Sequence, residues 1–544
     1  MNMKPWLKSY GAVSHEIDAD RYPSLTVELD RAMLEYAELP AFHAFGQTLT
    51  YAEVDARSRA LAGYLQKKLG VRKGDRIAVM LPNIFAFPII CIAIARIGAV
   101  QVNVNPLYTP RELAHQLNDA GAGIIIAYAG ATPTLAQIVD QTEVKTVITA
   151  GLGDGSGTAV PGPEVDRSLL SATTVNEAIE QGYALTYESP AISGDDLLFL
   201  QYTGGTTGLS KGAQLTHRNI IANIEQTGAF FAEARRPGQE VIVTAIPLYH
   251  IFALAVNFFG HFLIGAQNWL IANPRDMDAF IETLKAARPT VLTGVNTLYA
   301  ALAAHPRAAE VDWTRLRLVC GGGAAVIEAV SQRWEAVTGT IIREGYGLSE
   351  TSPVVSTNPM FVDRFTGTTG LPVPSTDIKL LDDEDKIVDI GKPGEICVKG
   401  PQVTRGYWRN PEATEKAFTA DGYFRTGDIG IFDDNGFLKI VDRKKDMVLV
   451  SGFNVYPNDV EAVVTAFPGV IECACVGVPD DKTGEAVKIF VVAAPGVRLS
   501  EEALIAHCRT EMAAYKVPKI VRLVEALPKS TVGKILRREL RDAG

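Results

Sequence analysis

Short apolar runs typical of strands alternate with helix-like runs between Thr48 and Tyr128. The pattern predicts strands at 77–81, 100–103 and 123–127 and an apolar helix at 84–97. Strands that alternate with helices form a parallel sheet whose faces are covered by those helices. The chain is therefore predicted to be an α/β protein.

The alternation is repeated further along the chain. A Thr-Pro-Arg-Glu sequence at 109–112 has the composition of a capping box and predicts a helix at 111–120. A stretch rich in glycine, serine and proline at 151–163 interrupts the pattern, which resumes over 195–340. We expect two related α/β lobes.

The last third of the chain has a different character. Short strands and Asp-Asn-Gly turns at 366–442 predict a β-rich subdomain. Strands at 472–478 and 486–493 and helices at 458–466 and 501–513 then predict a small α+β unit. The charged cluster 443–446 between them is interpreted as a hinge. We expect a large N-terminal domain, 1–441, of two α/β lobes plus the β-rich subdomain, and a small mobile C-terminal domain, 442–544.

Composition limits the functional classes. The 544 residues are 47% apolar and 21% charged, which is typical of a soluble globular protein of two or more domains. A net charge of -10 disfavours nucleic acid as a partner. Of six cysteines, the close pair Cys473 and Cys475 lies in an alternating apolar stretch and is interpreted as packing. With no signal-peptide pattern at the N-terminus, we expect a reducing cytoplasm.

The longest apolar region, 241–272, is interpreted as a strand, a helix and a second strand. It contains proline, asparagine and two histidines, including His250, which a lipid-facing helix does not readily carry. We expect it to line a cavity for an apolar ligand. Peripheral contact with a membrane stays open.

A glycine- and hydroxyl-rich run follows the apolar string 197–200 and indicates a triphosphate site. It consists of Tyr202, Thr203, Gly204, Gly205, Thr206, Thr207, Gly208, Leu209, Ser210, Lys211 and Gly212. Small residues let the backbone approach phosphate oxygens, while the hydroxyls and one lysine supply donors. Lys211 is not preceded by glycine and not followed by serine or threonine, so the run is not a Walker A loop.

Four further segments follow this run in a characteristic order: EGYGLSE (344–350), YFRTGD (423–428), DRKKDMVLVSGFNVYP (442–457) and PKSTVGKILRREL (528–540). Together the five resemble the signature motifs of the adenylate-forming superfamily, which includes acyl-CoA synthetases, peptide-synthetase adenylation domains and firefly luciferase. The segments NVNPLYTPRELAHQLNDAG, PLYHIFAL and GVNTLY look particularly like bacterial long-chain fatty acyl-CoA synthetases.

The resemblance implies a two-step reaction that uses ATP, Mg²⁺ and coenzyme A. The fatty acid attacks the α-phosphate of ATP to give acyl-adenylate and pyrophosphate, and a thiol then displaces AMP. The glycine-rich run would hold the β- and γ-phosphates, with Lys211 following the pyrophosphate.

The resemblance also implies an adenine and ribose site, made of Gly321, Gly322, Gly323, Gly345, Tyr346, Gly347, Ser349, Asp428 and Arg443. Tyr346 would stack on adenine, with the triple glycine on the other side of the base. Asp428 would accept the ribose hydroxyls, and Arg443 would reach the ribose or a phosphate. Ser349 stands where the family usually has threonine, which keeps the hydroxyl.

Five more roles are implied by the same resemblance. Glu350 would bind magnesium, and Lys534 would bridge the acid's carboxylate and the α-phosphate. Lys445 would be the pivot about which the small domain rotates, and Gly452 would leave room for the pantetheine arm of coenzyme A. His250 would lie near the acid's carboxylate and gate the substrate tunnel.

Three alternatives stay open beside a long-chain fatty acid ligase. They are an aryl-CoA ligase of the coumarate type, a fatty acyl-AMP ligase serving a carrier protein, and a non-catalytic acyl-binding or transport protein. Family members are often dimers, and the resemblance leaves open a homodimer and peripheral contact with the inner membrane.

Overall fold

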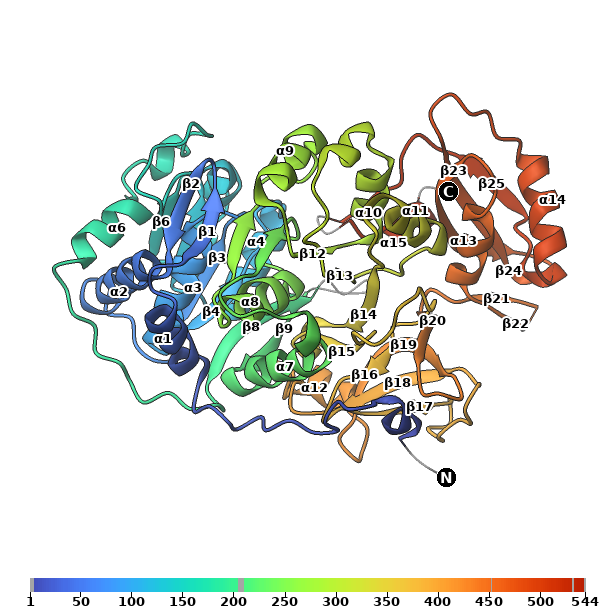
Figure 1. Cartoon of the computed structure of the whole chain (residues 1–544), viewed down its shortest axis with the longest axis horizontal. Helices are drawn as coiled ribbons and strands as arrows, with labels where there is room; N and C mark the ends of the chain where they lie inside the picture. The colour runs from blue at the N-terminus through green and yellow to red at the C-terminus, as the bar shows by residue number, and fades with distance from the viewer. Residues whose placement is uncertain (1–3, 204–209, 452, 531–532, 543–544) are drawn as a thin grey trace.

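The computed structural model describes residues 4–203, 210–451, 453–530 and 533–542 (Figure 1). Its first sheet has the order β7-β6-β5-β3-β4-β8-β9. The strands are β3 (Arg76–Met80), β4 (Val100–Asn103), β5 (Ile124–Tyr128), β6 (Thr146–Ala150), β7 (Thr173–Thr174), β8 (Leu197–Thr203) and β9 (Lys211–Thr216). All neighbours are parallel except β8 and β9. The strands and the parallel sheet expected from the sequence are confirmed.

The helices of this lobe are α1 (Leu25–Glu35), α2 (Tyr51–Lys67), α3 (Ala86–Arg96), α4 (Pro110–Ala120), α5 (Thr132–Ala136) and α6 (Val175–Gly182). The predicted helix at 111–120 is confirmed as α4, and its capping box between Thr109 and Glu112 is present. The predicted apolar helix is α3, which is buried along its whole length. Its hydrophobic cluster includes Leu254 and Phe258 from the second lobe, so the two lobes share one core.

The second sheet has the order β16-β15-β14-β13-β12-β10-β11-β1-β2. Its strands are β1 (Pro40–Ala44), β2 (Gln47–Thr50), β10 (Val241–Thr244), β11 (Gln267–Leu270), β12 (Val291–Gly294), β13 (Leu318–Gly321), β14 (Arg343–Gly347), β15 (Val354–Thr357) and β16 (Leu371–Pro372). Helices α7 (His217–Phe230), α8 (Gly260–Phe262), α9 (Met277–Ala287), α10 (Asn296–Ala304) and α11 (Glu328–Thr338) belong to this half of the chain.

The two lobes are interleaved in sequence, which corrects the predicted division at 151–163. Strands β8 and β9 follow that stretch but complete the first sheet, where β8 pairs with β4. Conversely, β1 near the N-terminus pairs in parallel with β11 of the second sheet. Parallel pairing depends on exposed strand edges rather than on order in the chain, so composition alone could not reveal this exchange.

The apolar region 241–272 forms strand β10, a π-helical segment (Ala253–Phe259) continued by α8, and strand β11. The predicted succession of strand, helix and strand is confirmed. In the part of the chain that the structure describes, no helix is long and apolar enough to cross a membrane.

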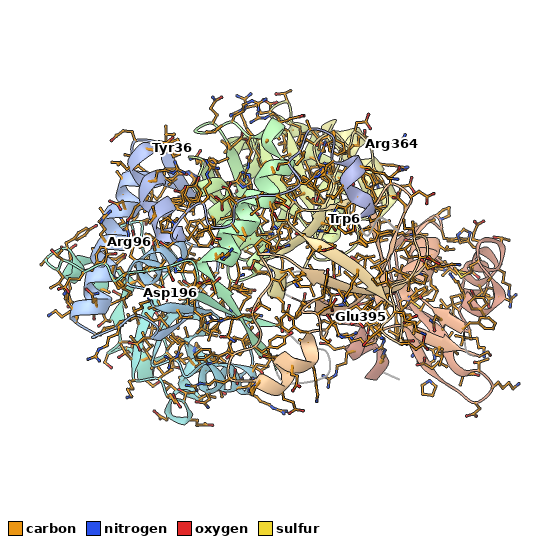
Figure 2. The ribbon with its side chains drawn as sticks, turned by 90° about the horizontal axis from the view of Figure 1, so that it is seen from below. Trp6, Tyr36, Arg96, Asp196, Arg364 and Glu395 are labelled. Atoms are coloured by element: carbon orange, nitrogen blue, oxygen red, sulfur yellow. The ribbon has the colours of Figure 1, made fainter. Side chains whose placement is uncertain are left out.

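The β-rich subdomain contains the sheet β17-β18-β19-β20, with strands β17 (Asp377–Leu381), β18 (Gly394–Lys399), β19 (Phe424–Phe432) and β20 (Leu438–Arg443), and helix α12 (Pro411–Ala417). The N-terminal segment packs against this subdomain (Figures 1 and 2). Trp6 is fully buried and stacks on Phe432, with their ring centroids 5.2 Å apart.

The C-terminal part has its own five-stranded sheet (Figure 1). Its elements are β21 (Val448–Val450), β22 (Phe453–Val455), β23 (Val470–Asp480), β24 (Gly484–Ala493), β25 (Ile520–Leu523), α13 (Pro457–Thr465), α14 (Glu501–Glu511) and α15 (Arg537–Asp542). The predicted strands and helices are confirmed. Cys473 and Cys475 are buried in β23, and no three His, Cys, Asp or Glu side chains among the described residues are grouped as metal ligands.

Candidate active site

The glycine-rich run connects the antiparallel strands β8 and β9, in which Thr203 lies opposite Lys211. The predicted phosphate-loop residues Gly204, Gly205, Thr206, Thr207, Gly208 and Leu209 lie outside the described residues. Lys211 begins β9, and its Nζ lies 4.5 Å from the ring centroid of Tyr407. The Ser210 carbonyl lies 2.9 Å from Nε2 of His115 on α4. The two ends of the loop are therefore fixed by strand pairing.

The Tyr202 side chain contacts α4 and β9. Its hydroxyl donates a 2.5 Å hydrogen bond to Oδ2 of Asp119 on α4. Its ring also lies against Gly212, where a Cβ atom would come within 3.0 Å of the ring. Of the predicted loop residues, Tyr202 and Gly212 thus anchor the strand pair to the lobe.

Glu350 lies just beyond β14, in a 3-10 turn that begins at Ser349. Its Oε1 accepts a 2.8 Å hydrogen bond from the hydroxyl of Tyr407, and its carbonyl accepts one of 2.7 Å from the amide of Thr404. Burial raises the pKa of the Glu350 carboxyl above its usual range, while the Tyr407 bond and the nearby Lys211 oppose that rise. The carboxylate is held from two directions by the segment that contains Thr404 and Tyr407.

Tyr346, Asp428 and Arg443 come together from two predicted motifs and the domain junction. The Tyr346 hydroxyl donates a 2.6 Å hydrogen bond to Oδ2 of Asp428. Asp428 on β19 lies opposite Arg443 on β20, and its Oδ1 is 3.5 Å from the Arg443 Nε. One carboxylate thus contacts both an aromatic hydroxyl and a guanidinium.

The predicted glycines lie at the ends of β13 and β14, where most of them have close neighbours. Gly321 ends β13 beside β14. A Cβ atom added at Gly322 would lie 3.2 Å from the ring of Phe252. Gly323 has a φ of +78°, which favours glycine. Gly345 pairs with Thr357, and a Cβ at Gly347 would lie 2.0 Å from the Pro353 carbonyl oxygen.

Lys534 lies in a tight loop before α15, where Ser530 N donates to the Lys534 carbonyl at 2.7 Å. The neighbouring Gly533 contacts the large domain, because an added Cβ there would lie 2.9 Å from Oγ1 of Thr297 and 3.0 Å from Cγ2 of Val295. The loop is therefore docked against the second lobe.

The surroundings of Lys534 are strongly charged. Burial, and then the positive charge of Arg443, lower the pKa of Lys534 to about 7, while Asp428 opposes this shift. Burial lowers the pKa of His250 to about 4, with Lys534 as the second cause. The C-terminal lysine thus interacts electrostatically with Asp428, Arg443 and His250, which all belong to the preceding part of the chain.

His250 follows β10 and precedes the π-helical segment. Its Nδ1 accepts a 3.3 Å hydrogen bond from the amide of Phe252, and the preceding Tyr249 carbonyl accepts one of 3.0 Å from the Gln201 amide group. With a pKa of about 4 the imidazole is neutral near pH 7.

The predicted pivot and coenzyme A residues lie around β20 to β22. Lys445 comes two residues after β20, and burial and the charge of Arg443 lower its pKa. Gly452 lies outside the described residues, between β21 and β22. On this hairpin Leu449 and Phe453 are about half exposed, and Phe453 stacks on Tyr515 at 4.8 Å.

Two features of the site were missed from the sequence. Tyr407 contacts both Glu350 and Lys211, yet it lies 57 residues from Glu350 in a polar stretch with no periodic pattern. Arg537 on α15 forms ion pairs with Glu461 (2.8 Å) and Asp442 (3.5 Å), which tie the last helix to the domain junction. Only the basic character of 529–538 was visible beforehand.

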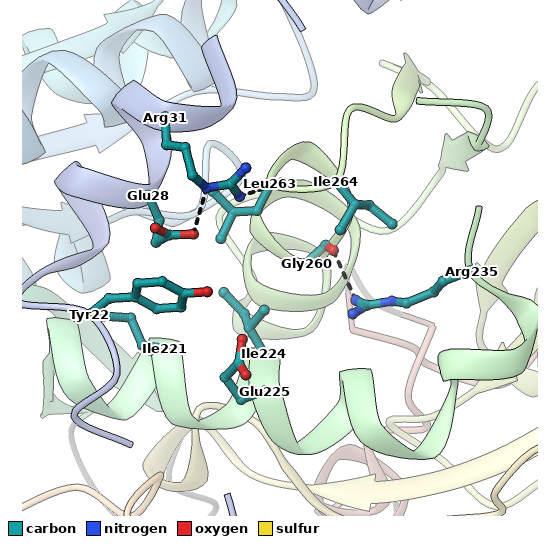
Figure 3. Close-up of a pocket in the computed structure, with 10 residues that line it drawn as sticks. All are labelled: Tyr22, Glu28, Arg31, Ile221, Ile224, Glu225, Arg235, Gly260, Leu263 and Ile264. Carbon is teal, nitrogen blue, oxygen red and sulfur yellow. Dashed lines mark hydrogen bonds and ion pairs between the residues drawn. The ribbon is translucent and has the colours of Figure 1, made fainter. Parts of the chain in front are cut away.

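A cavity of about 130 Å³ lies between α1, α7 and the segment at and just after α8 (Figure 3). It is lined by Tyr22, Glu28, Arg31, Ile221, Ile224, Glu225, Arg235, Gly260, Leu263 and Ile264. Arg31 contacts Glu28 at 3.0 Å, and Arg235 donates to the Gly260 carbonyl at 2.9 Å. Four charged side chains do not suit an acyl chain, so the apolar-ligand cavity stays a prediction.

Two family models match the chain: the AMP-binding enzyme model over residues 29–408 and the AMP-binding enzyme C-terminal domain model over residues 459–534. The chain therefore belongs to the AMP-binding enzyme family, the class that the fold and the site indicate. It is 49% identical to a long-chain-fatty-acid–CoA ligase of Escherichia coli O6:H1, with 99% of this chain and 98% of the relative covered.

Two further similarities are informative. A feruloyl-CoA synthase of an Amycolatopsis species is 36% identical, with 91% of this chain and 94% of the relative covered. The crystal structure of ATP-bound MatB from Rhodopseudomonas palustris has a TM-score of 0.85 and 31% identity, with 97% of this chain and 99% of that chain covered. The mixed α/β architecture with a smaller C-terminal part is that of adenylate-forming enzymes.

The donor groups near Lys211 suit magnesium carried by a nucleotide. Magnesium is usually bound by one or two carboxylates together with substrate phosphates, rather than by an all-protein cage. Glu350 offers one oriented carboxylate beside the end of the glycine-rich loop, and the described residues contain no cluster of three candidate ligands. The residues present therefore fit a metal that arrives with ATP.

Proposed function

We propose that this protein is an ATP- and coenzyme A-dependent ligase that activates long-chain fatty acids. The observation that carries the proposal is the docked Lys534 loop, which brings a lysine to Asp428, Arg443 and His250. The 49% identity to a long-chain-fatty-acid–CoA ligase over nearly the whole of both chains supports this choice of acid.

In the first half-reaction an oxygen of the fatty acid carboxylate attacks the α-phosphorus of ATP. A bond forms between that oxygen and phosphorus, the bond to the bridging oxygen breaks, and pyrophosphate leaves. Lys534 donates hydrogen bonds to the oxygens on which negative charge increases, an interaction worth on the order of 3 kcal/mol when the donor is preorganised. Magnesium bound with the nucleotide neutralises part of the triphosphate charge.

The remaining residues position the nucleotide. Tyr346 stacks on adenine, Asp428 accepts the ribose hydroxyls, and Arg443 reaches the ribose or a phosphate. The glycine-rich loop holds the β- and γ-phosphates, with Lys211 following the pyrophosphate. The hydrogen bond from Tyr346 to Asp428 supports a shared role, because it fixes the carboxylate beside the ring.

In the second half-reaction the thiolate of coenzyme A attacks the acyl carbonyl carbon, the acyl–phosphate bond breaks, and AMP leaves. The thiol proton is released to solvent. We propose that residues 442–544 rotate about Lys445 between the two steps and that Gly452 then faces the pantetheine arm. The position of Lys445 two residues after β20, where the chain leaves the β-rich subdomain, supports this assignment.

An aryl-CoA ligase is the second candidate, because a feruloyl-CoA synthase is 36% identical to this chain. The candidates are separated by measuring AMP release from purified protein with ATP and magnesium. The acids are octanoate, palmitate and 4-coumarate, each tested with and without coenzyme A. Coenzyme A-dependent release with palmitate is expected. A preference for 4-coumarate indicates the aryl ligase, adenylate formation without coenzyme A turnover indicates a carrier-protein ligase, and silence with every acid indicates a different acid substrate or a non-catalytic binding protein.

Cytoplasmic location, peripheral contact with the inner membrane and a homodimer belong to the same proposal. Co-sedimentation with anionic and neutral vesicles tests membrane contact, and light scattering across a concentration series tests the dimer. Binding to neither type of vesicle and a constant monomer mass would remove both from the proposal.

A further inference from the structure

Tyr407 lies in the segment between β18 and α12, and its backbone is firmly held. Its amide donates a 2.9 Å hydrogen bond to Oγ1 of Thr414, and the residue forms an antiparallel bridge with Ala213 of β9. The amide of Trp408 donates to the Gly212 carbonyl at 2.8 Å. The segment therefore pairs with β9 immediately beyond Lys211, and the tyrosine side chain is only 7% exposed.

The hydroxyl of Tyr407 fixes the orientation of a carboxylate. It donates to Oε1 of Glu350 at 2.8 Å, while Thr404 of the same segment holds the Glu350 carbonyl. A hydrogen bond to an ionised group is stronger than one between neutral groups and has a defined direction. Tyr407 therefore holds one oxygen of the Glu350 carboxylate in place.

The ring of Tyr407 holds a cation. Nζ of Lys211 lies 4.5 Å from the ring centroid, within the range of a cation–π contact. Glu350 and Lys211 influence each other electrostatically but do not form a direct ion pair within the described structure. A direct pair would use each charge to neutralise the other, whereas contact through Tyr407 leaves the carboxylate for a metal ion and the ammonium for phosphate.

We propose that Tyr407 is a positioning residue that holds Glu350 and Lys211 apart and oriented for the magnesium ion and the phosphates of ATP. This inference rests on the proposed function, in which those two residues contact the nucleotide. The hydroxyl acts on the metal through Glu350, and the ring acts on the phosphates through Lys211. The two parts of one side chain can therefore be removed separately.

The test is calorimetric titration of ATP at several free magnesium concentrations and in EDTA, with Tyr407→Phe, Tyr407→Leu and the control Tyr10→Phe. Tyr10→Phe likewise removes a buried hydroxyl, but one that donates to the Pro372 carbonyl at 2.5 Å rather than to Glu350. We expect Tyr407→Phe to raise the free magnesium needed for half-maximal tightening of ATP binding about tenfold, while ATP affinity in EDTA changes less than twofold. Tyr407→Leu should also weaken ATP binding in EDTA by roughly two- to fivefold.

A double-mutant cycle separates positioning from general loss of structure. If the hydroxyl acts through Glu350, Tyr407→Phe should not further change the magnesium requirement in a Glu350→Gln protein. An unchanged magnesium requirement in Tyr407→Phe, an additive effect in the cycle, or an equal change in Tyr10→Phe would each overturn the proposal. This binding test contains no fatty acid, so it does not depend on which acid the protein activates. If the wild-type protein binds ATP normally but releases no AMP with palmitate, the proposed function is refuted and the binding test of Tyr407 stays valid.

Discussion

Tyr346 and Asp428, 82 residues apart, are joined by a 2.6 Å hydrogen bond between the end of β14 and β19 of the β-rich subdomain. Removing the hydroxyl with Tyr346→Phe keeps the ring but frees the carboxylate. Because a hydrogen bond to a charged group contributes about 1.5 to 3 kcal/mol, its loss should raise the KM for ATP about tenfold. Steady-state kinetics with varied ATP check this, and an equal rise in the KM for palmitate would argue against a nucleotide-specific role.

Lys534→Ala should abolish most acyl-adenylate formation, by roughly a hundredfold or more, because it removes a preorganised donor to the reacting oxygens. Thioester formation from synthetic palmitoyl-adenylate and coenzyme A should be retained. The two half-reactions are measured separately by pyrophosphate exchange and by thioester production. Equal loss of both steps would contradict both the role of Lys534 and the domain rotation.

The pH dependence of the first half-reaction should show the lowered pKa of Lys534, about 7. The working form is the protonated ammonium, so kcat/KM for ATP should fall as pH rises through about 7. In Lys534→Arg the guanidinium stays protonated, and this fall should disappear whatever the absolute rate. A wild-type profile that is flat from pH 6 to 9 would count against the lysine's depressed pKa.

Gly347→Ala should disturb the nucleotide site although it adds a single methyl group. The new Cβ would lie 2.0 Å from the Pro353 carbonyl oxygen, so the backbone between Tyr346 and Glu350 must move. ATP affinity should fall at least tenfold, because both neighbouring residues are displaced. Gly123→Ala is the matched control, since an added Cβ there meets nothing within 4 Å, and calorimetric ATP titration compares the two.

Arg537→Met should destabilise the C-terminal part of the chain. Glu461 and Asp442 would lose their guanidinium partner, and an uncompensated buried charge costs about 3 to 5 kcal/mol. Limited proteolysis should then cleave residues 442–544 faster, while the rest of the chain keeps its protection. The pair Arg537→Met with Glu461→Gln should recover part of the loss, and failure of that recovery would exclude charge pairing as the cause.

Local patterns were sufficient for much of this fold. The capping box predicted α4 within one residue, and the apolar runs predicted β3, β4 and β5, because caps and periodicity act over a few residues. The sheet to which each strand belongs was not predictable in this way. Assigning β8 and β9 to the second lobe was wrong, because β8 pairs with β4, about 100 residues earlier in the chain, and β9 pairs with β8.

The same distinction applies to the site. The resemblance to the family identified Glu350, Asp428, Arg443 and Lys534 as candidate site residues. In the structure, Asp428 and Arg443 interact electrostatically with Lys534. Tyr407 was missed because its importance comes from two partners that are distant in sequence, Glu350 and Lys211. A residue that orients other residues produces no pattern of composition or spacing in the sequence, so it cannot be found from the sequence in this way.

The exchange of strands between the two sheets has a consequence for biosynthesis. Phe42 on β1 pairs with Asn268 on β11, so an early strand must wait for about 226 further residues to be made. At roughly 5 to 20 residues per second, that wait lasts tens of seconds on the ribosome. Throughout it, the edge of β1 that pairs with β11 has no native partner, and this hairpin is where we expect chaperones to bind the nascent chain.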